Sequence, residues 1–390
     1  MSTTFALDDT QRMLQDSLSR FLADQHGLEQ RLHLLDQAHD APPLWRALAE
    51  DLGILGAAFS EDQGGLGGGL AEHLLIMEAF GEALYVGPYV STAVIAGSLL
   101  QRSPEPAWQA LLGRILEGRA IVALAHTEPA ARHGWQGLRT RVSAHPSGDG
   151  LLLSGHKTVV HGARWATDLL VTALDPQAGQ GEQGVSLLCV PAQASGIRRT
   201  DVRTIDGGHA SELFFDNVPV QATQCVGPRG QARPLVEQAL DEATLATCAE
   251  ALGVLQRLMR DTLDYVRQRR QFGAPIASFQ ALQHRLADMH LALEQARALT
   301  AATLPLLQDA SAAQRATAVS SAKVSVNRAC RLVGQGAVQL HGGMGMTEEL
   351  AIGHYFRRAT MIEQQFGPSD WHIDRIAQAH QAHQTQQAPR

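Results

Sequence analysis

The spacing of apolar residues changes twice along the chain, and these changes constrain the fold more than any other feature. From about Arg119 to Gly227, short apolar runs alternate with turn-forming residues: AIVALAH, GLLLSGHKTVV, DLLVTAL, GVSLLCVPA and SELFFDNVPV. Five such runs in a row are typical of an antiparallel β domain. The flanking segments instead repeat apolar residues at helical intervals. The pattern predicts an α+β chain with an N-terminal helical domain (1–118), a middle β domain (119–228) and a C-terminal helix bundle (229–390).

The helical segments can be placed from their apolar faces. In DDTQRMLQDSLSRFLAD, Asp8 or Asp9 is positioned to cap a helix whose apolar residues share one face. The C-terminal third contains a longer apolar face, formed by Leu240, Leu245, Leu252, Leu255, Met259, Leu263 and Val266. Wide apolar faces of this kind indicate a helix bundle, or burial between subunits.

Composition excludes several classes of protein. The net charge of −7 and the pI near 6.2 argue against a nucleic-acid surface, which is normally basic. No apolar run approaches the ~18 residues that a membrane helix needs. The four cysteines are far apart and form no CxxC pair, so we expect no metal or dithiol site. Free cysteines and an N-terminus without an apolar signal segment favour the cytoplasm. GxSxG, P-loop and HExxH motifs are absent from the sequence.

The stretch VRQRRQFGAPIASFQ combines three arginines with Phe272, Gly273 and Pro275. One interpretation is structural: positive charge complements the end of a helix, which glycine and proline then stop. The other is functional: a guanidinium is directed at a pyrophosphate, with an aromatic ring beside it. The residue pattern alone favours the structural interpretation.

Two further segments allow both kinds of interpretation. In VQLHGGMGMTEE, the backbone of Gly342, Gly343 and Gly345 would let a ligand approach closely, although a plain inter-helix loop would look the same. In LAHTEPAARHG, Thr127 and Glu128 leave an expected strand and form either a simple turn or part of a site.

Taken together and in this order, TEP, RRQFG and QLHGGMG resemble the acyl-CoA dehydrogenase family, as do LAEDLGILGAAFSEDQGGLG and EAFGEAL near the N-terminus. The resemblance covers nearly the whole chain. It implies a tetramer with FAD between subunits, an acyl-CoA substrate and an electron-transfer flavoprotein as the electron acceptor. The implied chemistry is α,β-dehydrogenation, in which a carboxylate removes the α-proton of the thioester while the β-hydride leaves for the flavin.

The resemblance also assigns cofactor-binding residues. Arg269 corresponds to the arginine that reaches the FAD pyrophosphate of a neighbouring subunit, with Phe272 beside it. Gln339 corresponds to the glutamine that contacts the same FAD, together with the backbone of Gly342 and Gly343. In the β domain, Thr127 corresponds to the threonine that bonds the flavin ring. In the family, a Trp-x-Thr segment lines one side of the flavin. The corresponding residues here are Val159, Val160 and His161, so His161 occupies part of that wall.

The expected catalytic base is missing from both positions that the family uses. The usual glutamate position holds Phe366, and Glu363 lies three residues earlier. The alternative position, on the first long C-terminal helix, holds Ala243. Glu242 adjoins it, but one residue along a helix turns a side chain by ~100°. Glu242 is therefore the candidate base only if that helix is rotated or the register differs by one.

These departures affect one half of the expected FAD site and not the other. The wall at Val159–His161 and the turn AARHG after Thr-Glu-Pro are altered, whereas Arg269 and Gln339, which serve a neighbour, are present. This asymmetry resembles the smaller subunit of heteromeric acyl-CoA dehydrogenases of the pimeloyl-CoA and steroid side-chain types, which implies fatty acid or steroid catabolism. We therefore expect an oxidoreductase that forms a homo-oligomer or pairs with a second acyl-CoA dehydrogenase-like subunit. The alternatives are a non-catalytic scaffold for a partner flavoprotein and a related flavin oxidase on a non-thioester substrate.

Overall fold

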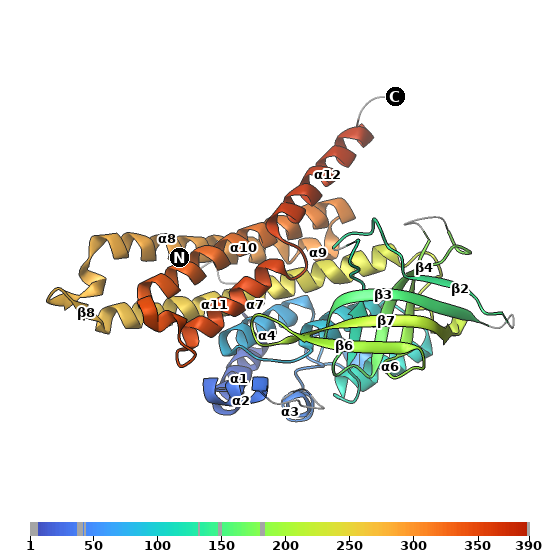
Figure 1. Ribbon diagram of the computed structural model, residues 1–390, viewed down its shortest axis with the longest axis horizontal. Coiled ribbons are helices and arrows are strands. Elements are labelled where there is room, and N and C mark those ends of the chain that lie inside the picture. Colours follow the sequence, from blue (N-terminus) through green and yellow to red (C-terminus); the bar gives the residue numbers. More distant parts are fainter. Residues whose placement is uncertain are drawn as a thin grey trace. The chain divides into compact units, whose positions relative to one another are not determined.

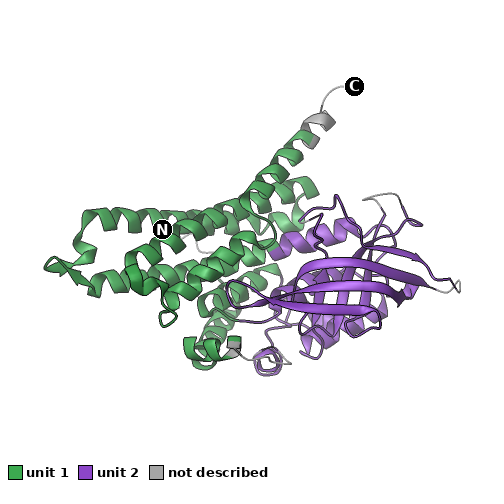
Figure 2. Ribbon diagram, viewed as in Figure 1, with its two compact units in different colours: residues 1–36, 70–85, 244–390 green, residues 37–69, 86–243 purple. Residues whose placement is uncertain are grey.

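The computed structural model describes residues 7–36, 42, 44–131, 133–146, 150–179 and 184–387. The chain divides into two compact units (Figure 2). Unit 1 comprises residues 1–36, 70–85 and 244–390, and unit 2 comprises residues 37–69 and 86–243. The long helix α7 (Arg233–Gln268), which is labelled in Figure 1, begins in unit 2 and continues in unit 1.

Unit 1 is helical. Besides most of α7, its helices are α1 (Asp9–Gln25), α2 (Leu28–Asp36), α4 (Leu70–Ala83), α8 (Gln280–Thr303), α9 (Leu306–Asp309), α10 (Ala312–His341), α11 (Ala351–Gln364) and α12 (Ser369–Gln387). Helix α1 begins with the cap that the sequence predicts, since the Asp8 carboxylate accepts from the Gln11 N–H at 2.8 Å. Helices α8 and α10 pack closely, because a Cβ built on Gly336 would lie 2.6 Å from Sδ of Met289.

Unit 2 is built on a seven-stranded sheet with the order β1-β4-β2-β3-β7-β6, and β5 also pairs with β4. The strands are β1 (Val122–Ala125), β2 (Arg141–Ala144), β3 (Leu151–His161), β4 (Asp168–Leu174), β5 (Val185–Pro191), β6 (Ile197–Arg203) and β7 (His209–Val220). Most pairs are antiparallel, as the sequence predicts, while β1–β4 and the short β2–β4 pairing are parallel. Alternate strand residues such as Leu153, Val171 and Phe215 form the core.

Three shorter helices belong to the same unit: α3 (Trp45–Glu50), α5 (Gly97–Gln101) and α6 (Pro106–Leu116). None of the helices in the described ranges combines the length and the hydropathy that crossing a bilayer requires. The described residues also contain no group of three or more His, Cys, Asp or Glu side chains that could hold a metal ion.

Candidate functional site

One end of unit 1 is formed by the connection between α7 and α8. The chain makes a small hairpin of β8 (Arg270–Gln271) and β9 (Ala274–Pro275), which is labelled at β8 in Figure 1. Its two turn residues, Phe272 and Gly273, have φ values of 52° and 79°. Positive φ at both central positions is typical of a type I′ hairpin turn. Gly273 tolerates this conformation easily, whereas a phenylalanine adopts it only under constraint.

The same hairpin leaves Phe272 93% exposed, with an edge contact to Phe279 at a ring distance of 6.2 Å. Arg269, the last residue before the hairpin, is exposed as well. A large aromatic ring and a guanidinium that project together from a helix end form a surface suited to a ligand or a neighbouring chain. The helix therefore ends at Gln268, before the glycine and proline, which instead lie in the hairpin that follows it.

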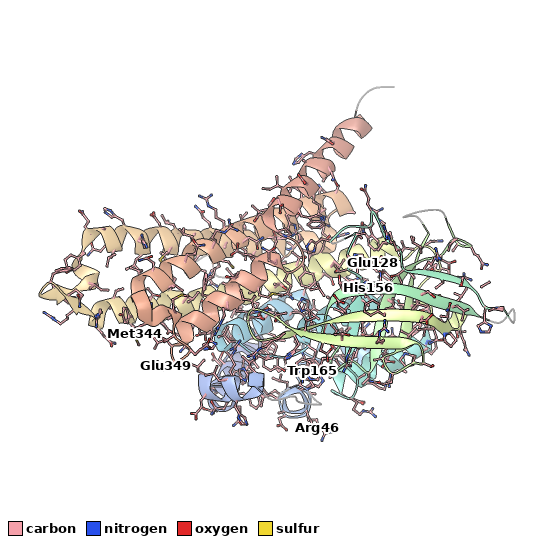
Figure 3. The ribbon with its side chains drawn as sticks, in the orientation of Figure 1. Arg46, Glu128, His156, Trp165, Met344 and Glu349 are labelled. Carbon is pink, nitrogen blue, oxygen red and sulfur yellow. The ribbon has the colours of Figure 1, made fainter. Side chains whose placement is uncertain are left out.

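The end of α10 lies beside the end of α7. The ring of His341, the last residue of α10, stacks on Tyr265 of α7 at 4.2 Å, and the Tyr265 hydroxyl donates to the His341 carbonyl at 3.5 Å. Gln339 and the turn that begins at Gly342 are exposed next to this contact. Figure 3 labels Met344 in the same turn. The residues that the resemblance assigns to a neighbour's FAD thus share one end of unit 1.

Gly342 and Gly343 of this turn differ in whether the backbone conformation requires a glycine. Gly342 has φ 61° and ψ −141°, a backbone conformation that disfavours other residues. Gly343 has no positive φ, and a Cβ built there would meet no atom within 4 Å. Within the described chain, nothing requires glycine at position 343. The backbone at Gly343 is therefore open to close approach by an external group.

The other two residues that the resemblance assigns to the cofactor, Thr127 and His161, lie on neighbouring segments of unit 2. The half-buried Thr127 follows β1, and its carbonyl accepts from the Thr158 N–H of β3 at 2.9 Å. The register of β3 against β7 shifts between Lys157 and Val160, and Val159 within this bulge has φ 53° and is 51% exposed. His161 ends β3 and pairs with Ala210. The altered turn at 130–134 includes residue 132, which lies outside the described residues.

A buried ion pair, which the sequence analysis does not anticipate, connects these segments. The Lys157 ammonium donates to Glu128 Oε1 at 2.8 Å, to the His126 carbonyl at 3.1 Å and to Thr172 Oγ1 at 3.1 Å. Burial lowers the pKa of Lys157 to about 8 against the opposing effect of Glu128. Burial alone would raise the pKa of Glu128, but Lys157 and nearby N–H donors hold it below its usual value. Figure 3 labels Glu128 in unit 2. A lysine in an apolar strand pattern was the available signal for this pair.

The candidate base Glu242 is buried and already paired. Its Oε1 accepts from Nη2 of Arg102 at 2.5 Å, its Oε2 lies 3.5 Å from Nη1, and Gln238 is a further neighbour at 3.5 Å. The Glu242 side chain is 8% exposed. Ala243 beside it is fully buried. Both oxygens of this carboxylate therefore face the Arg102 guanidinium.

The other family position, Phe366, lies between α11 and α12, half-buried and with φ 59°. The nearby Glu363 is buried and accepts from Nη2 of Arg331 at 2.8 Å. Gln365 accepts from Arg358 at 3.3 Å, which helps to hold this loop in place. The acid three residues before Phe366 is therefore paired with an arginine of α10.

Sequence reasoning also missed the pair between Glu250 of α7 and Arg358 of α11. The guanidinium contacts both carboxylate oxygens, at 2.6 and 2.7 Å, and Glu250 is 5% exposed. Glu250 is two helical turns beyond Ala243, so both point to similar sides of α7. The two partners are 108 residues apart in sequence, and no local pattern signals the pairing.

Unit 1 also contains a groove of about 670 Å³ between α1, α4, α7 and α8, with Leu74, Leu252 and Met259 among its apolar lining. None of the predicted site residues lines this groove. Its arginines are paired, for example Arg297 with Glu78 at 2.7 Å. The groove is therefore separate from the positions that carry the expected chemistry.

Comparison with known proteins gives the same family along the whole chain. Residues 8–119 match the description "Acyl-CoA dehydrogenase, N-terminal domain", residues 123–218 match "Acyl-CoA dehydrogenase, middle domain", and residues 233–381 match "Acyl-CoA dehydrogenase, C-terminal domain".

Individual relatives agree. The chain is 29% identical over 385 residues to the probable acyl-CoA dehydrogenase YngJ of Bacillus subtilis, an alignment that covers 97% of this chain and 99% of the relative. Its fold is similar to a chain of the ChsE4-ChsE5 complex from Mycobacterium tuberculosis, with a TM-score of 0.85, 26% identity and complete coverage of both chains. It is also similar to a chain of a variant of the Tcur3481-Tcur3483 steroid ACAD, with a TM-score of 0.85, 28% identity and coverage of 97% and 99%.

Proposed function

The chain belongs to the acyl-CoA dehydrogenase family, whose members are flavoprotein oxidoreductases, and from this premise we propose that it is one subunit of a heteromeric, FAD-dependent acyl-CoA dehydrogenase. The proposed reaction is α,β-dehydrogenation of an acyl-CoA thioester. The second subunit is an acyl-CoA dehydrogenase-like chain that supplies the catalytic carboxylate. An electron-transfer flavoprotein is the proposed electron acceptor.

The observation that carries the proposal is the state of the carboxylates near the two base positions. Phe366 and Ala243 cannot accept a proton. Glu242 and Glu363, the acids beside them, are buried and paired with Arg102 and Arg331. Because the α-proton of a thioester is only weakly acidic, its removal needs a carboxylate with free lone pairs in a dry site. The acids beside these two positions are instead each paired with an arginine of the same chain.

The cofactor-facing residues support a shared site. When bound, FAD would accept the hydride from the substrate β-carbon. The exposed Arg269 would donate to its pyrophosphate, and Phe272 would cover it from one side. Gln339 and the open backbone at Gly343 would contact the same molecule. All four are on unit 1 and are exposed in the chain by itself, as a site completed by a neighbour requires.

Two of the similar structures support the heteromeric assembly. The ChsE4-ChsE5 and Tcur3481-Tcur3483 proteins are both described as pairs of different chains, and the second is described as a steroid ACAD. At 26% and 28% identity they favour a two-chain enzyme and a fatty or steroid acyl group as substrate.

The proposal is tested by assaying the purified chain alone against a panel of acyl-CoA thioesters with an artificial electron acceptor. Loss of a positioned general base typically costs ~10²–10⁴ in rate, so we expect weak turnover or none. Adding the partner chain should restore it. A Glu242→Gln variant is measured in parallel. Robust turnover by the wild-type chain alone would contradict the partner requirement, and its loss in the variant would identify Glu242 as the base.

A second candidate function is a non-catalytic scaffold that stabilises a partner flavoprotein. The altered flavin wall favours it, because the exposed Val159 stands where the family has a tryptophan and His161 where it has a threonine. The two functions predict different results for a complex in which Arg269 and Gln339 have lost their side chains. A complex whose activity survives removal of Arg269 and Gln339 side chains would favour the scaffold, whereas loss of flavin and activity together would favour the shared site.

A further inference from the structure

The lysines of the chain are few and lie inside it. The sequence holds 32 residues that are lysine or arginine, and of these Lys157 and Lys323 are lysines, whereas all the others are arginines. Both lysines are 0% exposed. A guanidinium stays protonated in proteins and does not act as a nucleophile, whereas a neutral ε-amine does. Because both lysines belong to the described part of the chain, the folded protein presents no ε-amine to solvent.

Lys157 occupies a site that suits an ammonium and not a guanidinium. It makes three hydrogen bonds, of 2.8, 3.1 and 3.1 Å, to Glu128 Oε1, the His126 carbonyl and Thr172 Oγ1. Three bonds that diverge from one nitrogen use the full donor capacity of an ammonium. A guanidinium is larger, and its donors form a planar fork, so an arginine would not reach these three acceptors in the same space.

Lys323 of α10 has a similar role at the end of a neighbouring helix. Its ammonium donates to Asn327 Oδ1 at 2.8 Å and to the carbonyl of Ile362 in α11. The last carbonyls of a helix lack an intrahelical donor, and this lysine satisfies one of them inside unit 1. Burial lowers the pKa of both lysines, that of Lys157 to about 8. Lysine therefore remains where the fold needs a compact buried ammonium, and what keeps these amines from reacting is that reagents cannot reach them.

The thiols are withdrawn from solvent in the same way. Cys189, Cys248 and Cys330 are buried, and burial raises the pKa of each to about 12. Cys225 is half-buried, and its pKa is also raised, mainly by burial. The thiolate is the nucleophilic form of cysteine, so a raised pKa keeps these side chains in the unreactive form at neutral pH.

The compounds of the proposed reaction attack these two kinds of group. When an amine nitrogen attacks the thioester carbonyl carbon, the C–S bond breaks, an amide forms, and CoA leaves as a thiol with the proton. The unsaturated thioester that dehydrogenation produces reacts differently: a thiolate adds to its β-carbon, and a proton is added at the α-carbon. A protein that binds such thioesters meets them repeatedly, so accessible lysines and cysteines on it are exposed to both reactions.

We propose that the folded chain resists covalent modification by the thioesters it handles, because its amines and thiols are buried and its surface cations are arginines. This proposal rests on the proposed function, which names the electrophiles. The ion pairs of the surface do not themselves require arginine. Arg46 and Glu50, for example, form an exposed i,i+4 pair at 3.6 Å, which a lysine could form as well and which contributes little to stability.

The experiment exposes the purified FAD-containing protein, with its partner chain if the two copurify, to acetyl-CoA and separately to acryloyl-CoA. A peptide with one lysine and one cysteine is added as the reactivity reference, and mass spectrometry of the intact chain and its peptides counts the adducts. We expect Lys157 and Lys323 to react at least ~10³-fold more slowly than the reference lysine, because a stably folded protein is unfolded in fewer than ~1 in 10³ molecules. Cys225, the most accessible thiol, should react several-fold more slowly than the reference cysteine.

The matched control is Arg46→Lys, which places one amine on the surface without changing the charge, since the Arg46 side chain is 85% exposed. This variant should gain one acetyl group, at residue 46, at a rate similar to that of the reference lysine. In concentrated urea, Lys157 and Lys323 should react as fast as the reference, which shows that burial protects them.

Two results would overturn the proposal: modification of Lys157 or Lys323 in the folded protein at the reference rate, or reaction of Cys225 with acryloyl-CoA as fast as the reference cysteine. The readout is mass and not turnover. A chain that stays unmodified here, and that dehydrogenates no acyl-CoA with its partner present, supports the resistance and contradicts the proposed function alone.

Discussion

The buried pair of Lys157 and Glu128 allows a sharp test of how unit 2 is held together. The Lys157 side chain is fully buried and that of Glu128 is 2% exposed. Removing one partner leaves an unpaired charge in a low-dielectric core, which typically costs ~3–5 kcal/mol. Two backbone N–H groups, of Arg139 and Thr140, still bind Glu128 at 2.7 and 3.1 Å, so we expect Lys157→Met to fall near the lower end of this range.

The double variant separates the charge effect from the packing effect. In Lys157→Met/Glu128→Gln no charge is buried, and the glutamine oxygen can keep an N–H donor. We therefore expect the double variant to be destabilised by much less than the sum of the two single variants, with a coupling energy of ~2–4 kcal/mol. Urea unfolding followed by circular dichroism measures the four proteins of the cycle.

The control is the exposed pair of Arg46 and Glu50, whose side chains are 85% and 59% exposed. Glu50→Gln should leave the urea midpoint unchanged within error, because exposed pairs contribute little. The reasoning would be refuted by a Lys157→Met variant that loses less than ~1 kcal/mol, or by single-variant effects that simply add in the double variant.

Three further predictions follow from the same structure. Arg269→Ala should weaken FAD retention by ~1.5–3 kcal/mol, measured as flavin content and affinity after purification, and unchanged values would contradict the assignment. Burial lowers the pKa of His73 and His126 to about 3, whereas a histidine of the unfolded chain has a pKa of ~6.5, so the unfolded chain binds more protons as the pH falls below that value. The free energy of unfolding should therefore fall by ~2 kcal/mol per histidine between pH 7.5 and pH 5, and a flat pH profile would contradict this reasoning. Gly343→Ala should leave the free energy of unfolding unchanged or raise it by ~0.4–1 kcal/mol, and it should weaken FAD binding. Gly342→Ala should lower the free energy of unfolding, because Gly342 has a positive φ. Equal losses of stability in the two variants would refute the distinction.

The strands that sequence reasoning found and missed differ in burial. The five predicted runs correspond to β1, β3, β4, β5 and β7, which contain buried apolar residues. The two unpredicted strands, β2 and β6, are mostly exposed. Strand β6 reads IRRTDVR and is the edge of the sheet, where only one side is paired. Its charged side chains suit an edge strand but give no apolar alternation, so no periodicity marks it.

The start of α1 was predictable for a related reason: its signal is local. The cap at Asp8 depends on residues a few positions apart, whereas α7 ends at Gln268, several residues before Gly273 and Pro275. The sequence did not indicate that the residues after α7 would form a hairpin with Phe272 in a left-handed conformation. A bulky residue under that constraint, and almost fully exposed, is more readily explained by an external partner than by the stability of the chain itself.

The carboxylates show most clearly what a sequence reading of this site leaves out. Counting along the chain finds that the two family base positions hold Phe366 and Ala243, and it nominates Glu242 as a neighbour. It does not find that Glu242 is paired with an arginine 140 residues away. Whether a buried glutamate accepts a proton depends on its charge partners, and these come from other helices. The proposed function therefore requires that a second chain bring a carboxylate that is not already paired with an arginine.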